Sequence, residues 1–500
     1  MHRLRDPGKL LDCDRRKYDR TFSAAEEILH RDNVRVVLRS NAFHSQSILR
    51  PLNRQVTPFK NPQRHIWFRR RPLYQPTTTF GRTYLVLRNL TLGVFTISLA
   101  TFGAFYLLDA RSAAHRYIFA PVLRLLTPDP EDAHRIAVLA LKHGLHPKDN
   151  REDDPRLAVE VPFHSVIWLT KLWGRPLSNP VGVAAGLDKQ AEAVDGLFDL
   201  GFSYVEIGSV TPEPQFGNAR PRYFRLSSDK AVINRLGFPS DGAISVCRNL
   251  QDRIRNYFIK TGTQVDSTTP RSLHADKMLA VNLGKNIDTP IAEAETDYIK
   301  GVKVFAPYAD VLVINLSSPN TPGLRSLQTS TYLSKLLSSI REEVSRLPSP
   351  APKLVVKIAP DLNVSEIRDI ASAVVQNNID GVIVTNTTVQ RPGSLTSPDE
   401  KVYEQGGLSG PPLKPLSLRA LKLLRGQLKQ IPGGKNVVLI GCGGISSGKD
   451  AIEFARAGAS IVQCYTGFVY DGVGFAARIK DEILEELGSR RWVDMIGRDS

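Results

Sequence analysis

Eight short apolar runs between residues 181 and 466 constrain the fold of this 500-residue chain more than any other feature. Each run is continuously apolar, without the alternation of a half-exposed strand, which indicates strands buried on both faces, as in a parallel sheet. The runs are Val181–Ala185, Tyr204–Val210, Leu279–Gly284, Val311–Leu316, Leu354–Ala359, Gly381–Thr387, Val437–Gly441 and Ile461–Thr466.

Stretches with helical periodicity separate most of these runs, and together they define the fold class. Eight strand–helix repeats over about 300 residues predict an α/β fold, a (β/α)8 TIM barrel. A doubly wound open sheet is the competing prediction. The helical stretches include Gln190–Leu200, Tyr332–Leu347, Val364–Asn377, Ser417–Gln430 and Gly448–Ala457.

Nearly every apolar run ends in polar or glycine-rich residues, and barrel enzymes carry their chemistry at the carboxyl ends of the strands. A barrel does not need such a ring of amides, hydroxyls and lysines for stability, so the ring predicts a functional site. Its members are Ala184–Gly186 with Lys189, Gly208–Ser209, Asn282, Asn315 with Ser317 and Ser318, Lys357, Thr385–Thr387, Gly441–Gly444 and Tyr465–Thr466.

Three features of this ring point to the kind of ligand. The glycine-rich turn Gly441–Gly448 suits a phosphate, because backbone N–H groups and a helix N-terminus attract anions; a plain tight turn is the alternative. Lys357 lies in an apolar run and needs an anionic partner, either a ligand or a structural ion pair. Several asparagines suit a flat, amide-rich ligand, although turn or cap roles are the alternative; these are Asn234, Asn282, Asn315, Asn320 and Asn386.

The net charge of +16 is concentrated at the N-terminus, where residues 1–108 carry 19 Lys/Arg and 7 Asp/Glu. The body of the chain therefore gives no electrostatic reason to bind nucleic acid. Between Asn33 and Leu108 there is no acidic residue, whereas arginine and serine are frequent. This composition is typical of a mitochondrial targeting segment, and a solvated basic tail is the alternative.

Asn89–Leu108 contains no charged residue. As a helix it would be about 30 Å long, the thickness of the hydrocarbon core of a bilayer. It predicts a membrane span, and a buried core helix is the alternative. Because the basic residues precede it, we expect the upstream end to stay on the positive-inside face. In a mitochondrion this leaves the C-terminal body in the intermembrane space.

A pair of short amphipathic helices is expected after the span. Apolar residues recur at helical spacing from Tyr117 to Leu126, and Asp129 is a candidate N-cap with Pro130 at the first helical position. The pair predicts a lipid-facing vestibule or a helical hairpin packed on the next domain. The predicted organisation is a basic targeting region over 1–82, a single transmembrane helix over 83–110, a helical extension over 111–150 and the barrel over 151–500.

Several classes of site are excluded by missing motifs. The four cysteines have no paired short spacing, which excludes a disulfide scaffold and a Cys-rich zinc site. No Gly-x-Ser-x-Gly elbow surrounds Ser318, and the chain has neither a P-loop nor a His-Glu-x-x-His metal motif, so no metal site is expected. Ser318 would need water or a neighbouring threonine to relay a proton.

An ordered series of motifs gives the chain a family resemblance over roughly residues 110–500. The chain resembles the class 2, membrane-bound dihydroorotate dehydrogenases, flavin enzymes of pyrimidine synthesis. The motifs are Asn179–Lys189, Glu206–Pro212, Gly217–Arg222, Asn234–Phe238, Asn315–Asn320, Thr385–Thr388, Gly406–Gly410 and Ile440–Gly444. Pro239 departs from the pattern, since many relatives carry asparagine there.

The resemblance implies a role for each matching position. Ser318 matches the catalytic base, which takes a proton from C5 of dihydroorotate while the C6 hydride passes to flavin N5. FMN-contacting positions match Ala184, Ala185, Gly186, Ser209, Asn282, Asn315, Lys357, Thr385, Gly410, Gly444, Tyr465 and Thr466. Substrate-holding positions match Lys189, Asn234, Arg235, Leu236, Gly237, Phe238, Asn315, Asn320, Asn386 and Thr387, and quinone-tunnel positions match His134 and Arg225.

The implied function is oxidation of (S)-dihydroorotate to orotate, with FMN as hydride acceptor and a ubiquinone-type membrane quinone as final acceptor, at the mitochondrial inner membrane. No cysteine lies in the Ser318 loop, and a cysteine base is what the soluble class would require. Two rival hypotheses remain: another FMN barrel oxidoreductase, such as a hydroxy-acid oxidase with a histidine base, and a non-catalytic, membrane-tethered binding module.

Overall fold

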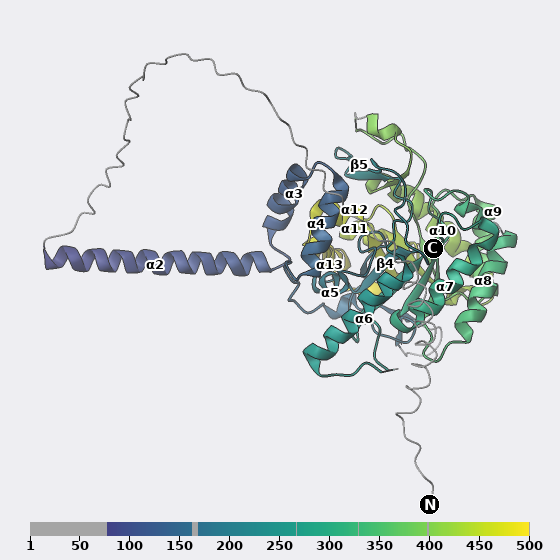
Figure 1. Ribbon diagram of the computed structural model, residues 1–500, viewed down its shortest axis with the longest axis horizontal. Coiled ribbons are helices and arrows are strands. Elements are labelled where there is room, and N and C mark those ends of the chain that lie inside the picture. Colours follow the sequence, from purple (N-terminus) through teal and green to yellow (C-terminus); the bar gives the residue numbers. More distant parts are fainter. Residues whose placement is uncertain (1–77, 163–168, 267, 329, 398–399, 500) are drawn as a thin grey trace, which may run out of the picture. The chain divides into compact units, whose positions relative to one another are not determined.

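The computed structural model describes residues 78–162, 169–266, 268–328, 330–397 and 400–499 (Figure 1). The chain divides into two compact units, Met1–Thr78 and Thr79–Ser500, and every element described below belongs to the second. The predicted targeting segment therefore lies almost entirely outside the described residues, and its role stays a prediction.

Eight parallel strands close into a barrel, which confirms the predicted fold and excludes the open sheet. Each of the eight apolar runs forms one barrel strand. Their side chains are almost all buried, as expected for strands covered on both faces. The strands are β3 (Val181–Val183), β4 (Tyr204–Val210), β7 (Met278–Leu283), β8 (Val311–Asn315), β9 (Lys353–Ile358), β10 (Gly381–Val384), β12 (Val438–Cys442) and β13 (Ile461–Cys464).

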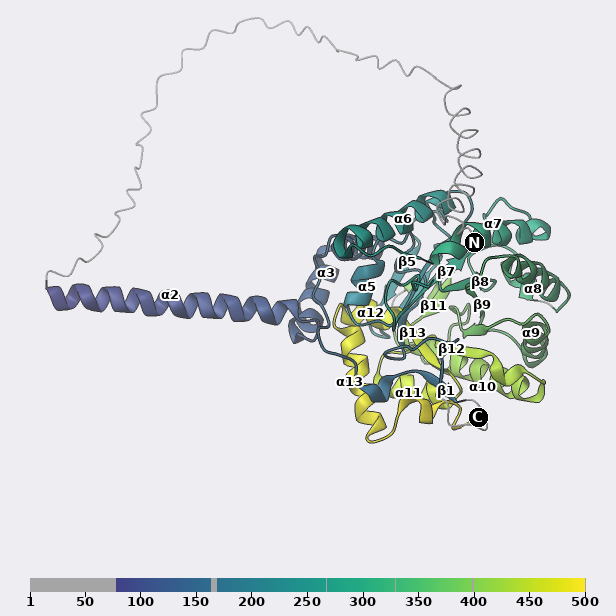
Figure 2. The same cartoon turned by 90° about the horizontal axis from the view of Figure 1, so that it is seen from below.

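Helices surround the strands, and Figure 2 shows α7 to α10 following one another around the barrel. The starts of two helices are fixed locally by capping boxes, Asn363 with Glu366 for α9 and Ser447 with Asp450 for α11. The helices are α5 (Val194–Asp199), α6 (Gly242–Thr261), α7 (Ala294–Phe305), α8 (Ser330–Ser345), α9 (Val364–Gln376), α10 (Lys414–Gln430), α11 (Gly448–Arg456), α12 (Thr466–Asp471) and α13 (Phe475–Leu487).

Two small antiparallel sheets accompany the barrel. One pairs β1 (Glu160–Pro162) with β2 (Leu169–Lys171). The other has the order β11–β6–β5, with β5 at Tyr223–Leu226, β6 at Ala231–Asn234 and β11 at Gly407–Ser409. β5 and β6 follow barrel strand β4, whereas β11 follows β10, which is diametrically opposite in the barrel order. This second sheet therefore links loops from opposite sides of the carboxyl end of the barrel.

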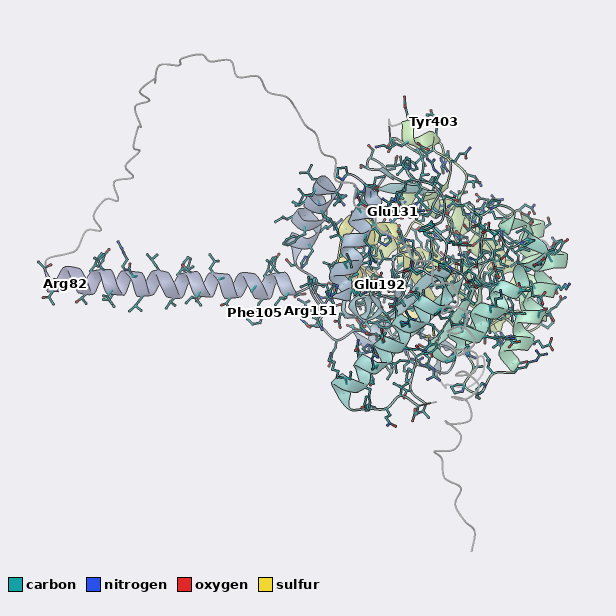
Figure 3. All side chains as sticks on the ribbon, viewed as in Figure 1. Arg82, Phe105, Glu131, Arg151, Glu192 and Tyr403 are labelled. Carbon is teal, nitrogen blue, oxygen red and sulfur yellow. The ribbon has the colours of Figure 1, made fainter. Side chains whose placement is uncertain are left out.

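The uncharged stretch is part of a longer helix, α2 (Thr79–Leu108), whose N-terminal turns contain Arg82 and whose last turns contain Phe105 (Figure 3). It begins before the predicted residue 83 and ends before 110. Its most apolar 18-residue window has a mean hydropathy of 1.7, and none of the side chains of the helix is buried. α2 is thus long and apolar enough to cross a membrane, and it is not a core helix.

The helical extension follows as a π-helical turn (His115–Phe119), α3 (Ala120–Leu126) and α4 (Pro130–Lys142). The predicted N-cap is confirmed, since Asp129 Oδ1 accepts a hydrogen bond from the Glu131 N–H at 2.8 Å. α4 packs against α5 and β5, so the extension does dock on the barrel domain. It nevertheless leaves large apolar side chains exposed, namely Tyr117, Ile118, Phe119, Val122, Leu125, Leu126 and Ile136.

Candidate active site

The polar strand ends converge on one cavity that opens to solvent. The predicted site residues that line it are Ala184, Ala185, Gly186, Lys189, Ser209, Asn234, Leu236, Gly237, Phe238, Asn315, Ser318, Asn320, Lys357, Thr385, Asn386, Thr387, Gly410, Gly444, Tyr465 and Thr466. Four predicted residues do not line it: Asn282, Arg235, His134 and Arg225.

Asn282 lies beneath the cavity floor, where it positions two lining residues. Its Oδ1 accepts hydrogen bonds from the Ser209 hydroxyl and from Asn315 Nδ2, the latter at 3.2 Å. Its own Nδ2 donates to Glu206 at 2.5 Å. Asn282 therefore acts on the cavity through its neighbours and does not face a ligand.

Arg235 points away from the cavity, although the adjacent Asn234 lines it. Its guanidinium pairs with Glu404 and lies 4.7 Å from the centre of the Phe224 ring. Neighbouring residues of an extended chain project to opposite faces, so only one of this pair can reach a ligand. A substrate contact by the Arg235 side chain is not supported by this geometry.

Lys357 has a buried ion-pair partner inside the barrel. Its Nζ lies 3.6 Å from Oε1 of Glu206, and both side chains are almost completely buried. Lys357 therefore forms the structural ion pair that was one of its two predicted roles, and it also lines the cavity, where a ligand could bind. Sequence reasoning missed Glu206, although a charged residue inside the apolar run Tyr204–Val210 is the same signal that singled out Lys357.

Ser318 lies in the loop after β8 and is buried. Its Oγ is 3.4 Å from the Thr321 hydroxyl and 3.3 Å from the Asn320 backbone nitrogen. The threonine that a serine base would need is thus present. Among the described residues, no histidine lines the cavity, which disfavours the hydroxy-acid oxidase hypothesis.

Lys189 supplies a second cation at the cavity. Its Nζ donates to the Gly186 carbonyl at 2.9 Å. Burial lowers the pKa of Lys189 to about 8, against the opposing attraction of Glu131. A buried ammonium with a depressed pKa binds an incoming carboxylate strongly, because the carboxylate restores the stability of the charged form.

Asparagines from three segments form a hydrogen-bonded wall of the cavity. Asn320 Nδ2 donates to the backbone oxygen and the Oδ1 of Asn234, at 3.1 and 3.2 Å. Asn386 Nδ2 donates to Ser317 Oγ at 3.1 Å. These bonds fix the amide planes, so the wall offers a preorganised set of donors and acceptors to a flat ligand.

The glycine-rich turn after β12 packs closely on α10. Gly443 and Gly444 have φ values of +117° and +85°. A Cβ on Gly444 would lie 2.6 Å from the Lys414 backbone nitrogen, so the turn has no space for a larger residue. The close, side-chain-free backbone at the rim suits a phosphate.

His134, on α4, and Arg225, on β5, do not line this cavity. His134 Nε2 is 2.5 Å from the Leu187 carbonyl. Burial, reinforced by the charge of Lys189, lowers the pKa of His134 to about 3, so its ring is neutral near pH 7. Nε2 therefore donates to that carbonyl, which leaves Nδ1 as an acceptor. Arg225 Nη1 donates to the Thr127 carbonyl at 3.3 Å.

Comparisons with known proteins agree on one family. The family profile described as Dihydroorotate dehydrogenase matches residues 168–487. The protein named dihydroorotate dehydrogenase (quinone), mitochondrial, of Schizosaccharomyces pombe is 50% identical and aligns with 82% of this chain and 90% of its own length. The protein of the same name from Mus musculus is 44% identical over 77% of this chain and 89% of its own length.

Solved structures agree as well. The crystal structure of the Eimeria tenella dihydroorotate dehydrogenase with ferulenol has a TM-score of 0.66 and 40% identity, and covers 74% of this chain and 96% of that chain. The ligand-free form from the same organism gives a TM-score of 0.65. The matched profile, the extent of the relatives and the barrel with its polar mouth lead to one conclusion: this chain belongs to the dihydroorotate dehydrogenase family.

Proposed function

We propose that this protein oxidises (S)-dihydroorotate to orotate, with FMN as the hydride acceptor and a ubiquinone-type membrane quinone as the final acceptor, in pyrimidine synthesis. One observation carries the proposal: the serine, the two ammonium groups, the amide wall and the glycine turn all border a single cavity. Relatives named dihydroorotate dehydrogenase (quinone), mitochondrial, support it.

The residues of the cavity fit FMN. The backbone at Gly443 and Gly444 suits the phosphate, and the ammonium of Lys357 suits a ring that gains negative charge. Ala184–Gly186, Ser209, Asn315 and Thr385 line the same cavity and offer small side chains and amide or hydroxyl groups. When bound, FMN supplies a two-electron acceptor for the hydride that leaves C6 of the substrate.

The chain's own residues bind the substrate and move its proton. We assign the substrate carboxylate to Lys189 and the ring amides to Asn234, Asn320, Asn386 and Thr387. Ser318 then removes the proton from C5. Because serine is a weak base, we assign the onward transfer of a proton to the neighbouring Thr321 hydroxyl, which lies 3.4 Å from Ser318 Oγ.

The N-terminal elements support a membrane location. We propose that α2 spans the mitochondrial inner membrane once, that the basic region over residues 1–82 carries the targeting information and that the barrel faces the intermembrane space. The exposed apolar side chains of the extension would contact lipid, and His134 and Arg225 would line the quinone path. The body of the chain, with little net charge, gives no reason to expect nucleic acid as a partner.

Spectroscopy of the purified full-length protein in detergent tests the proposal. We expect a yellow protein that dihydroorotate bleaches under anaerobic conditions and that a ubiquinone analogue then reoxidises. A colourless protein would favour the binding-module hypothesis. A yellow protein that lactate-type acids bleach, but dihydroorotate does not, would favour the hydroxy-acid oxidase hypothesis.

A further inference from the structure

The side chain of Glu206, on β4, lies inside the barrel and meets donors from three other strands. The residue is 1% exposed and does not line the cavity. Its Oε1 accepts from Asn282 Nδ2 on β7, and its Oε2 accepts from Gln463 Nε2 on β13, both at 2.5 Å. Oε1 also lies 3.6 Å from the ammonium of Lys357 on β9. Two amide donors and a cation together favour the ionised form of a carboxyl group, so Glu206 carries a negative charge.

A series of hydrogen bonds fixes the direction of the Asn282 amide. The backbone N–H of Ser317 donates to Asn315 Oδ1 at 3.2 Å, so Asn315 directs its Nδ2 the other way. That Nδ2 donates to Asn282 Oδ1, also at 3.2 Å, which leaves Asn282 Nδ2 to face Glu206. Because a backbone N–H can only donate, the series must end in a donor at Glu206, and a proton on the same carboxylate oxygen would clash with it.

Lys357 is the member of this ion pair that lines the cavity. Its side chain is 5% exposed, whereas the side chain of Glu206 is fully buried. The separation of 3.6 Å between Nζ and Oε1 is that of an ion pair and is too long for a normal hydrogen bond. Glu206 therefore compensates the charge of Lys357 without occupying its hydrogen-bond donors. Because both groups are buried, salt screens this compensation only weakly.

We propose that Glu206 lowers the midpoint potential of bound flavin by compensating the charge of Lys357. The inference rests on the proposed function, which assigns the flavin to the cavity that Lys357 lines. Reduction adds negative charge to the flavin ring, and an uncompensated ammonium nearby would favour the reduced form. A flavin stabilised in this form accepts electrons from the substrate readily but passes them to a quinone reluctantly. Glu206 acts through Lys357, as a positioning residue, to balance the two half-reactions.

Glu206→Gln removes this charge and keeps the size of the side chain. The new NH2 group faces Gln463, whose amide can turn over to accept from it, because Gln463 Oε1 has no other hydrogen-bond partner in the described part of the chain. The midpoint potential should become more positive, and the equilibrium constant for flavin reduction should rise about tenfold or more. Bleaching by dihydroorotate should become faster and reoxidation by a ubiquinone analogue slower. General damage to the fold would slow both half-reactions.

Redox titration of the full-length holoenzyme with dithionite and reference dyes measures the potential independently of the catalytic reaction. Asp149→Asn is the matched control. The Asp149 carboxylate is also fully buried and pairs with the Lys480 ammonium at 2.7 Å, but neither residue lines the cavity. The potential of this variant should be unchanged. Glu206→Asp keeps the charge and should shift the potential much less than Glu206→Gln.

Three outcomes would overturn the inference. These are an unchanged or more negative midpoint potential in Glu206→Gln, an equal shift in Asp149→Asn, and a shift in Glu206→Asp as large as that in Glu206→Gln. If Glu206→Gln fails to fold, the same substitution in a Lys357→Met background decides, because it leaves no buried ammonium without a counter-ion. The double variant should have a more positive potential than Lys357→Met alone. A flavoprotein that shows these shifts but is not bleached by dihydroorotate would support the inference and contradict the proposed function.

Discussion

The guanidinium of Arg222 donates two hydrogen bonds to the carboxylate of Glu131, at 2.6 Å from Nη2 to Oε1 and 3.0 Å from Nε to Oε2. Glu131 lies in the first turn of α4 (Figure 3), whereas Arg222 immediately precedes β5. The pair therefore fastens the helical extension to the small sheet at the mouth of the barrel. Bidentate pairs of this kind fix orientation as well as adding stability.

Glu131→Gln should loosen this attachment by about 1.5–3 kcal/mol, the range for hydrogen bonds to charged groups. We expect quinone-dependent turnover to fall more than anaerobic bleaching by dihydroorotate. Burial by itself raises the pKa of Glu131, but the bonds and charge of Arg222 outweigh it and the net pKa is lowered from 4.5. The ionised Glu131 therefore stabilises the folded protein fully above pH 4.5, and this contribution is lost as the pH falls through the lowered pKa of Glu131.

Thermal melts and both half-reactions, measured against pH, check this prediction. Asp499→Asn is the control, because it removes the carboxylate of an exposed ion pair with Arg456. Exposed ion pairs of this kind contribute little to the free energy of unfolding. Equal loss of both half-reactions in Glu131→Gln would contradict the proposed division of labour between extension and barrel.

Ser318→Ala should lower turnover about 10²–10⁴-fold, the usual range for a lost general base, while flavin stays bound. Stopped-flow bleaching of the flavin by dihydroorotate measures the step directly. Ser365→Ala removes an exposed hydroxyl at the start of α9 and should have no effect. Near-normal bleaching in Ser318→Ala would remove this serine from the mechanism.

The depressed pKa of Lys189 predicts a pH dependence for substrate binding. The ammonium is present below about pH 8 and is lost above it, so kcat/KM for dihydroorotate should fall about tenfold per pH unit well above 8. Lys189→Arg keeps its charge throughout this range and should abolish the decline. A flat profile up to pH 9.5 in the unmodified protein would show that Lys189 does not bind the carboxylate in its charged form.

A shortened chain that begins at Asp109 should be soluble and still bind flavin, because α2 buries no side chain. Asp109 is kept since its backbone oxygen bonds His115 Nε2 at 3.1 Å. Size-exclusion chromatography and the flavin absorbance check this. A second truncation through residue 147 should damage quinone turnover more than bleaching. Loss of flavin from the first truncation would show that the domain boundary is wrong.

The barrel could be predicted because its strands are local features. Every apolar run became a strand, and the errors lie at the ends. The run Gly381–Thr387, for example, extends past β10, which ends at Val384. Thr385, Asn386 and Thr387 leave the sheet to line the cavity, as their polar side chains predicted, but the β-branched threonines do not mark where the strand ends.

The three-stranded sheet could not be predicted in the same way. One of its two pairings, that of β6 with β11, joins Asn234 to Gly407, which are far apart in the chain. When no tight turn connects two short strands, the sequence near each strand does not indicate which strand it pairs with.

The candidate site was predictable in outline because barrel topology gathers the strand ends. Individual orientations were not. Asn282 and Arg235 lie close to the cavity but face elsewhere, since one is directed at Glu206 and the other at Glu404. Glu206, the buried partner of Lys357, could have been predicted from the sequence, because it is also a charged residue within an apolar strand.

The sheet of β5, β6 and β11 has a consequence for how this mouth can change over evolutionary time. A shift of one residue in either loop would turn its whole set of side chains to the other face of the sheet. An insertion near β11 would therefore disturb Tyr223 and Asn234, which come from the far side of the barrel. The pairing therefore constrains the lengths of both loops together, whereas single side chains at the mouth can be exchanged without changing the register.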